Sequence, residues 1–133
     1  MIIRKSVMES MILHAERDAP IEACGCLAGQ DGVVTRHYPM ANADGREDHF
    51  SFDTREQFAV YRAARGEGLN VLGVYHSHPA TPARPSPEDL RLARDPDVVY
   101  VIVSLLGGSR TVRGYRVRQG AAQEEPLTIE EDA

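Results

Sequence analysis

The chain has 133 residues and a formal net charge of −5 at pH 7. A chain of this length buries roughly two-thirds of the surface that it exposes when unfolded, so we expect one domain spanning residues 1–133. The negative charge repels nucleic-acid phosphates and anionic lipids, so we expect binding to neither nucleic acid nor membrane. No segment approaches the ~20 apolar residues of a membrane span, and the charged N-terminus is unlike a signal peptide. We therefore expect a cytoplasmic protein.

The N-terminal part of the chain predicts a helix followed by a β-hairpin. Ser6 and Glu9 form a capping-box sequence, and the helical apolar stripe that follows is ended by Pro20. Residues 22–40 then predict two strands joined by a turn at residues 30–32, where Asp and Gly are typical turn residues.

The next elements are a short strand, a helix and a longer strand. Residues 49–53, "HFSFD", predict a short strand. Asp53 and Glu56 form a second capping signature, and the helix that they begin ends at the glycines of residues 66–68. The apolar run over residues 70–78 predicts another strand.

The C-terminal half predicts the rest of an α/β sheet. After three prolines, Ser86 as N-cap and Pro87 at the first helical position begin a short helix. The continuous apolar run over residues 98–106 predicts a strand that is buried on both faces, and residues 110–120 and 127–129 complete the sheet. The expected fold class is α/β: a single domain with a mixed central β-sheet flanked by about three helices.

Three side chains around the end of the strand over residues 70–78 form a candidate metal site. Because side chains on a strand alternate between faces, His76 and His78 point the same way and Ser77 points to the other face. Asp89 lies eleven residues after His78, where the proline-rich loop can fold its carboxylate back over the strand end. Two imidazoles and one carboxylate, with the fourth position left to water, are typical of a catalytic zinc site.

Simpler interpretations of the same residues stay open at this point. A His-x-His pair at a strand end is often only a pair of exposed histidines. Ser86 and Asp89 have the spacing of a capping box, which by itself explains both residues. Cys24 and Cys26 are too close in sequence to staple a fold, so we expect them to be reduced.

Two longer motifs indicate a family. The segment "HSHPATPARPSPED", residues 76–89, has the His-x-His-Pro and Ser-x-x-Asp signature of the JAMM (MPN-plus) zinc metallopeptidases. The upstream segment "PIEACGCLAG", residues 20–29, resembles the motif that carries the glutamate of this family. The chain thus resembles the minimal prokaryotic branch of the JAMM family, and the resemblance implies a cytidine-deaminase-like JAMM/MPN fold.

The resemblance also implies a role for each matched residue. His76, His78 and Asp89 would bind one zinc ion per chain. Glu22 would hold the attacking water as general base and then protonate the leaving amine, and Ser86 would hydrogen-bond the developing oxyanion.

Members of the prokaryotic branch act on ubiquitin-like sulfur-carrier proteins that end in Gly-Gly. The implied function is zinc-dependent hydrolysis of the peptide or isopeptide bond after that Gly-Gly. The tail of the carrier would reach the metal by lying along a neighbouring strand edge as an added β-strand, and Asn42 would orient the substrate backbone.

Two alternatives remain open in the sequence: a non-catalytic MPN-type interaction scaffold, and a non-haem iron enzyme that uses the same ligands. Deamination is disfavoured because the chain lacks the His-x-Glu and Pro-Cys-x-x-Cys pattern. The oligomeric state is unknown from the sequence.

Overall fold

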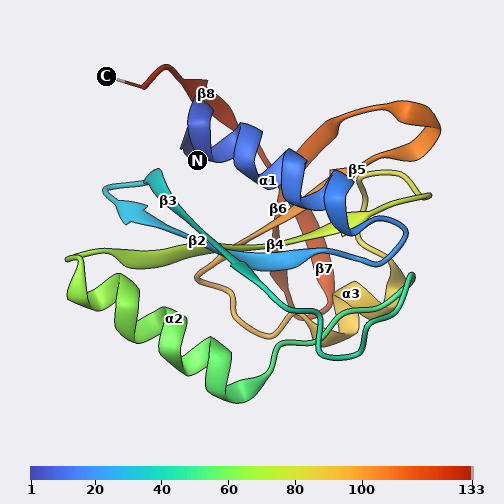
Figure 1. Ribbon diagram of the computed structural model, residues 1–133, viewed down its shortest axis with the longest axis horizontal. Helices are drawn as coiled ribbons and strands as arrows, with labels where there is room; N and C mark the ends of the chain where they lie inside the picture. Colours follow the sequence, from blue (N-terminus) through green and yellow to red (C-terminus); the bar gives the residue numbers. More distant parts are fainter. Residues whose placement is uncertain (133) are drawn as a thin grey trace.

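A mixed β-sheet runs through the computed structural model, which describes residues 1–132, and helices cover both of its faces (Figure 1). The strand order is β7-β6-β5-β4-β2-β3-β1-β8; helix α1 lies on one face, and α2 and α3 lie on the other. The elements are β1 Ile2–Arg4, α1 Lys5–Asp18, β2 Cys24–Gln30, β3 Val33–Met40, α2 Thr54–Gly66, β4 Asn70–His78, α3 Pro87–Leu92, β5 Val99–Ser104, a 3-10 turn η1 Leu106–Gly108, β6 Thr111–Arg118, β7 Ala121–Glu125 and β8 Thr128–Glu130.

The central strands are buried on both faces, as predicted from their apolar runs. On β4, Tyr75 packs in the cluster beneath α1, while its neighbour Val74 belongs to the cluster beneath α2. The sheet curls around α1: β7 and β8 stand at opposite ends of the strand order, yet only two residues separate them in the chain. None of the helices over residues 1–132 has the length and apolar content needed to cross a bilayer.

The predicted hairpin and the second and third helix starts are confirmed. Strands β2 and β3 pair antiparallel around Asp31 and Gly32, which both have positive φ, as a two-residue hairpin turn requires. The Asp53 side chain accepts hydrogen bonds from the first backbone N–H groups of α2, and Ser86 caps α3.

The predicted capping box at Ser6 is wrong. Helix α1 begins at Lys5, directly after the short strand β1, which was not predicted. The Ser6 hydroxyl and its backbone N–H instead donate to the two carboxylate oxygens of Asp132, at 2.5 and 2.9 Å. A carboxylate from the far end of the chain therefore does what Glu9 was expected to do, because the last strand returns to lie beside β1.

The predicted strand over residues 49–53 is also absent, and this segment is irregular. It belongs to the loop of residues 41–53 between β3 and α2, whose backbone groups bond to side chains and to other loops rather than to a strand. Strand β7, in contrast, was not predicted, because its mostly exposed residues lack an apolar alternation.

The position of β4 decides what can lie beside its carboxyl end. Strand β4 pairs with β2 on one side and with β5 on the other, and the pairing with β5 continues to His78. Both edges of β4 are therefore occupied, so a substrate tail cannot add as a strand directly to β4. Its addition along a neighbouring edge stays a prediction.

Candidate metal centre and active site

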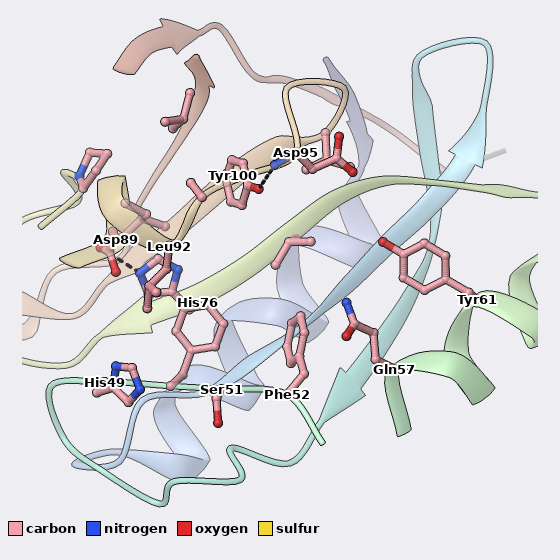
Figure 2. Close-up of a pocket in the computed structure, with 17 residues that line it drawn as sticks. His49, Ser51, Phe52, Gln57, Tyr61, His76, Asp89, Leu92, Asp95 and Tyr100 are labelled. Carbon is pink, nitrogen blue, oxygen red and sulfur yellow. Dashed lines mark hydrogen bonds and ion pairs between the residues drawn. The ribbon is translucent and has the colours of Figure 1, made fainter. Parts of the chain in front are cut away.

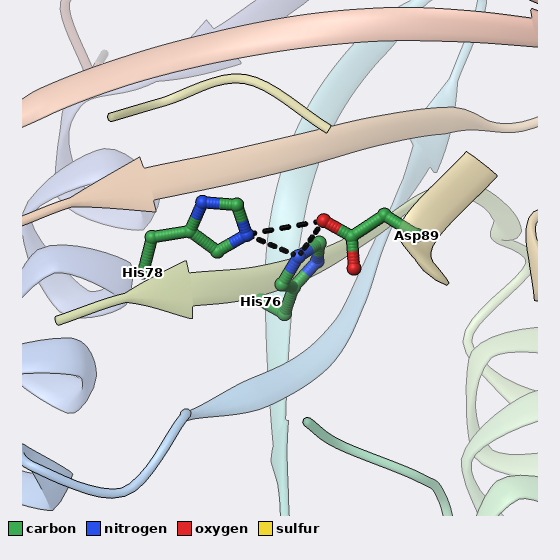
Figure 3. Close-up of side chains that lie close together, drawn as sticks. All are labelled: His76, His78 and Asp89. Atoms are coloured by element: carbon green, nitrogen blue, oxygen red, sulfur yellow. Dashed lines mark hydrogen bonds and ion pairs between the residues drawn. The ribbon is translucent and has the colours of Figure 1, made fainter. Parts of the chain in front are cut away.

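His76, His78 and Asp89 converge at the carboxyl end of β4 (Figure 3). The two histidine Nε2 atoms are 3.0 Å apart, and each is 3.1 Å from Asp89 Oδ2. The strand supplies both histidines from one face, as predicted, and the loop of residues 79–85 turns α3 back so that Asp89 meets them. These separations are close to the roughly 3.3 Å expected between ligands of a tetrahedral ion with bonds of about 2.0–2.1 Å.

The proton arrangement at His78 favours a cation between these atoms. The Nδ1 atom of His78 is 2.8 Å from the carbonyl oxygen of Pro82, and a carbonyl can only accept, so Nδ1 carries a hydrogen. In neutral His78 the Nε2 atom then presents a lone pair toward the Asp89 oxygen, which is also an acceptor. A divalent cation satisfies both lone pairs at once, so the residues present fit a metal ion.

Asp89 combines the two roles that its sequence context left open. The Ser86 backbone N–H donates to Asp89 Oδ2 at 2.9 Å, and the Asp89 N–H donates to Ser86 Oγ at 3.0 Å, which completes a capping box. The same Oδ2 atom faces both histidines. Capping thus holds the carboxylate in place as a candidate ligand, and it leaves the hydroxyl hydrogen of Ser86 free to donate.

The proline-rich loop that carries Ser86 is anchored at three successive carbonyl groups. Thr81 accepts from the Ser104 hydroxyl at 2.6 Å, Pro82 accepts from His78, and Ala83 accepts from the Tyr115 hydroxyl at 2.6 Å. The loop is therefore bonded to β5, β4 and β6 in turn, which fixes the path from His78 to α3.

Glu22 lies just before β2 on the same face as the two histidines. The backbone groups of Ala23 bond to Ser77, with Ala23 N–H to Ser77 Oγ at 2.8 Å and Ser77 N–H to Ala23 O at 2.9 Å. Since Cys24 pairs with His76 in antiparallel register, extension of that register by two residues places Glu22 opposite His78. Ser77, which the sequence only indicated to point away, is the residue that holds this segment.

The electrostatic environment separates Glu22 from Asp89. Glu22 is 5% exposed and its Oε1 atom has no hydrogen-bond partner, so burial raises the pKa of this carboxyl to about 8. Burial also opposes ionisation of Asp89, but the close contacts with His76 and His78 and the hydrogen bond from the Ser86 backbone outweigh it and hold the Asp89 pKa well below its ordinary value. Asp89 is thus the carboxyl that favours the anionic form, which a metal ligand requires, while the Glu22 carboxyl favours the protonated form and can exchange a proton.

The loop of residues 41–53 forms one wall of the centre, and sequence patterns gave no indication of this. The Phe50 ring stacks on the His76 ring with centroids 4.6 Å apart. The two ring nitrogens of His49 contact the carboxylates of Asp44 in its own loop and of Glu88 in α3, directly beside Asp89. Aromatic and charged contacts therefore join this loop to the histidine strand and to the aspartate helix.

A mainly apolar pocket of about 300 Å³ opens beside the centre (Figure 2). His76 and Asp89 line one end of it, and Tyr61 and Gln57 from α2 line the other. Leu92, which also lines the pocket, is 47% exposed. The pocket thus connects two of the three candidate ligands, His76 and Asp89, with the outer surface between α2 and α3.

A second group of polar residues lies on the opposite face of β4, beneath α1. His14 Nε2 is 3.0 Å from Asp18, its Nδ1 is 2.6 Å from the Tyr75 hydroxyl, and His37 Nε2 also contacts that hydroxyl. One neutral pattern satisfies every atom: His37 donates to Tyr75, Tyr75 donates to His14, and His14 donates to Asp18. Gly25 makes room for the ring, because a Cβ there would lie 2.5 Å from Tyr75.

This buried group predicts a loss of stability in mild acid. Burial lowers the pKa of His37 to about 4 from 6.5, so between these values the unfolded chain binds more protons than the folded one. The stabilisation is complete above pH 6.5 and is lost as the pH falls to about 4, at a cost of up to about 3 kcal/mol. Urea unfolding of the chelated protein at pH 7 and pH 4.5 should show this loss, and His37→Gln, which can still donate to Tyr75, should reduce it. An unchanged pH dependence in the variant would assign the acid sensitivity to other groups.

The sequence matches known proteins over most of its length. Residues 4–118 match the family described as prokaryotic homologs of the JAB domain. The chain is 42% identical to the CysO-cysteine peptidase of Mycobacterium tuberculosis, over 98% of this chain and 92% of that protein. It is 34% identical to a probable TtuB-protein conjugate cleaving protease of Thermus thermophilus, over 96% of this chain and 81% of that protein.

Solved structures show the same fold. The solution structure of a Desulfitobacterium hafniense protein superposes with a TM-score of 0.90 at 43% identity, covering 99% of this chain and 94% of that one. A JAB1/MPN domain protein from Archaeoglobus fulgidus superposes with a TM-score of 0.67 at 22% identity, covering 97% and 98%. The predicted JAMM/MPN fold is therefore confirmed.

Proposed function

The chain belongs to the prokaryotic JAB-domain family and is a hydrolase of the JAMM type, and from this premise we propose that it is a zinc-dependent peptidase of ubiquitin-like carrier proteins. We propose further that residues 1–133 act as one domain. The observation that carries the proposal is the convergence of His76, His78 and Asp89 within 3.1 Å, on the face of the sheet that also bears Glu22.

His76, His78 and Asp89 would hold the zinc ion through two Nε2 atoms and one carboxylate oxygen. A zinc ion bound by such ligands lowers the pKa of a coordinated water to about 7 and polarises a substrate carbonyl. The second nitrogen of His78 is bonded to Pro82, and this contact would fix the orientation of the ring as a ligand.

Glu22 is the proton carrier of the proposed reaction. Its carboxylate takes a proton from the water as the new oxygen–carbon bond forms, and it gives this proton to the amine as the carbon–nitrogen bond breaks. The unpartnered Oε1 atom supports this role, because no protein group competes for it.

Ser86 is suited to stabilise the negative charge that develops on the substrate oxygen. Its Oγ atom accepts from the Asp89 backbone, which aligns the side chain, and its hydroxyl hydrogen is left to donate. Because Asp89 bonds to the backbone of the same residue, the donor is held beside the metal ligand before substrate arrives.

The substrate class rests on the names of the relatives. Two of them are named for cleavage of CysO-cysteine and of TtuB-protein conjugates. By analogy, we infer a ubiquitin-like or sulfur-carrier substrate that is cut after a C-terminal Gly-Gly. The pocket between α2 and α3 supplies the route for its tail, since both edges of β4 are paired.

A panel of purified carriers, read by intact mass, tests this function. We expect a single cut directly after Gly-Gly in at least one carrier. Replacement of either glycine by valine should lower the rate of cleavage at least about tenfold, because a Cβ would clash where the backbone passes close to the metal site. Changes in the released residue should matter less. Equal cleavage of glycine and valine tails would contradict the narrow passage, and no cleavage of any carrier would contradict the substrate class.

A further inference from the structure

The backbone of Glu22 is held by the loop of residues 41–53 rather than by the sheet. Glu22 precedes the first residue of β2, so it has no ladder partner. Its N–H donates to the carbonyl oxygen of Arg46 at 3.0 Å, and its own carbonyl oxygen accepts from Asn42 Nδ2 at 3.0 Å. Both polar backbone groups of the proposed base therefore bond to this one loop.

Asn42 is also the residue that organises the loop. Its Nδ2 donates to the His49 carbonyl at 2.9 Å, and its Oδ1 accepts from the N–H groups of Asp44 at 3.1 Å and Ser51 at 3.3 Å. Both amide hydrogens are thus used within the protein at short distances. Asn42 has no free donor for a substrate, so the expectation that it orients the substrate backbone is not supported.

The same loop contacts the candidate ligands. Phe50 stacks on His76, and His49 pairs with Glu88, the neighbour of Asp89. Because Asn42 bonds to His49 and to Glu22 through one amide group, it sets the position of Glu22 relative to the two histidines and the aspartate.

We propose that Asn42 is a positioning residue for the hydrolytic reaction, acting through Glu22. This inference rests on the proposed function of Glu22 as the proton carrier. The Asn42 amide fixes the position of the Glu22 backbone relative to the end of β4. The Glu22 carboxylate is therefore already in place to reach the attacking water, and the segment that carries it does not have to become ordered first.

Two substitutions at Asn42 test the inference. Asn42→Asp keeps the shape and the acceptor for Asp44 and Ser51, but it places an acceptor against the Glu22 and His49 carbonyls; Asn42→Ala removes all of these bonds without adding charge. We expect both to lower kcat roughly 10–100-fold, with KM changed less than about twofold and one bound metal ion retained. Asn70→Asp, the same change at an exposed residue at the start of β4, is the matched control and should leave the rate unchanged.

A double-mutant cycle separates positioning from a general loss of structure. In a Glu22→Asp background, whose carboxylate is already misplaced, Asn42→Ala should cost much less than in the wild type. An equal cost in both backgrounds, or a loss confined to KM or to the folded fraction, would overturn the proposal.

Hydrogen exchange gives a test that does not need activity. The Glu22 amide, bonded to Arg46, should exchange at least about tenfold faster in Asn42→Ala, while amides of β5 keep their protection. Unchanged exchange at Glu22 would overturn the positioning role. Full activity of Glu22→Gln would contradict the proposed role of Glu22, and with it the catalytic part of the inference. The exchange result would still decide whether Asn42 holds the Glu22 backbone in place.

Discussion

Replacement of Glu22 by glutamine should reduce hydrolysis about 10²–10⁴-fold while the metal content of the protein stays the same. Glutamine is nearly isosteric and can hydrogen-bond a water molecule, but its amide cannot accept the proton that must leave the water and reach the amine. Glu22 is not among the three converging ligand atoms, so the metal should remain bound. Single-turnover rates on a cleavable carrier, together with elemental analysis of the same sample, measure both quantities.

Stability provides the control for this variant. Burial raises the Glu22 pKa from 4.5 to about 8, so the folded protein favours the protonated carboxyl. The contribution of this carboxyl to the free energy of unfolding is fully present below pH 4.5 and is lost as the pH rises through 8. At pH 8.5 the chelated wild type therefore carries an unfavourable buried charge that glutamine lacks, and Glu22→Gln should melt at the same temperature or higher. Retained turnover in a folded variant would place the base elsewhere.

Removal of the metal ligands should abolish both metal binding and activity. The protein purified without chelator should contain about one zinc ion per chain, and the double variant His76→Ala, His78→Ala should contain none, because a lone carboxylate cannot hold the ion. Binding to the folded state alone should stabilise the wild type by about 3–4 kcal/mol when free zinc is 100–1,000 times its Kd, and this gain should be missing in the variant.

Elemental analysis and reconstitution distinguish the possible outcomes. Chelated wild type should regain hydrolysis when zinc is added back, and the double variant should not. Iron in place of zinc, with oxygen consumption instead of hydrolysis, would support the non-haem iron alternative. Equal metal content in wild type and variant would show that the site is misassigned.

Local sequence was sufficient for the elements whose signals lie within a few residues. The hairpin turn at Asp31 and Gly32, the Asp53 cap and the Ser86–Pro87 start of α3 were all predicted, because turn and cap geometry depends on neighbouring residues. The alternation of a strand likewise placed His76 and His78 on one face, and the structure confirms their convergence.

Other features required contacts between residues that are distant in the sequence. Ser6 looked like the start of a capping box, but Asp132 lies there instead, because β8 pairs with β1. Residues 49–53 had the composition of a strand, yet their backbone groups are bonded by Asn42 and by other loops. Short-range patterns cannot predict a partner that arrives from the other end of the chain.

The sequence by itself determined which residue types are present at this centre and on which side of the strand they lie, since a motif and a two-residue period need only local geometry. The tertiary structure alone decided how they work together: that Asp89 caps α3 and faces both histidines with one oxygen, and that Glu22 stands opposite His78. The reason is that strand order and loop anchoring set the distances between segments, and these distances depend on how the whole sheet packs around α1.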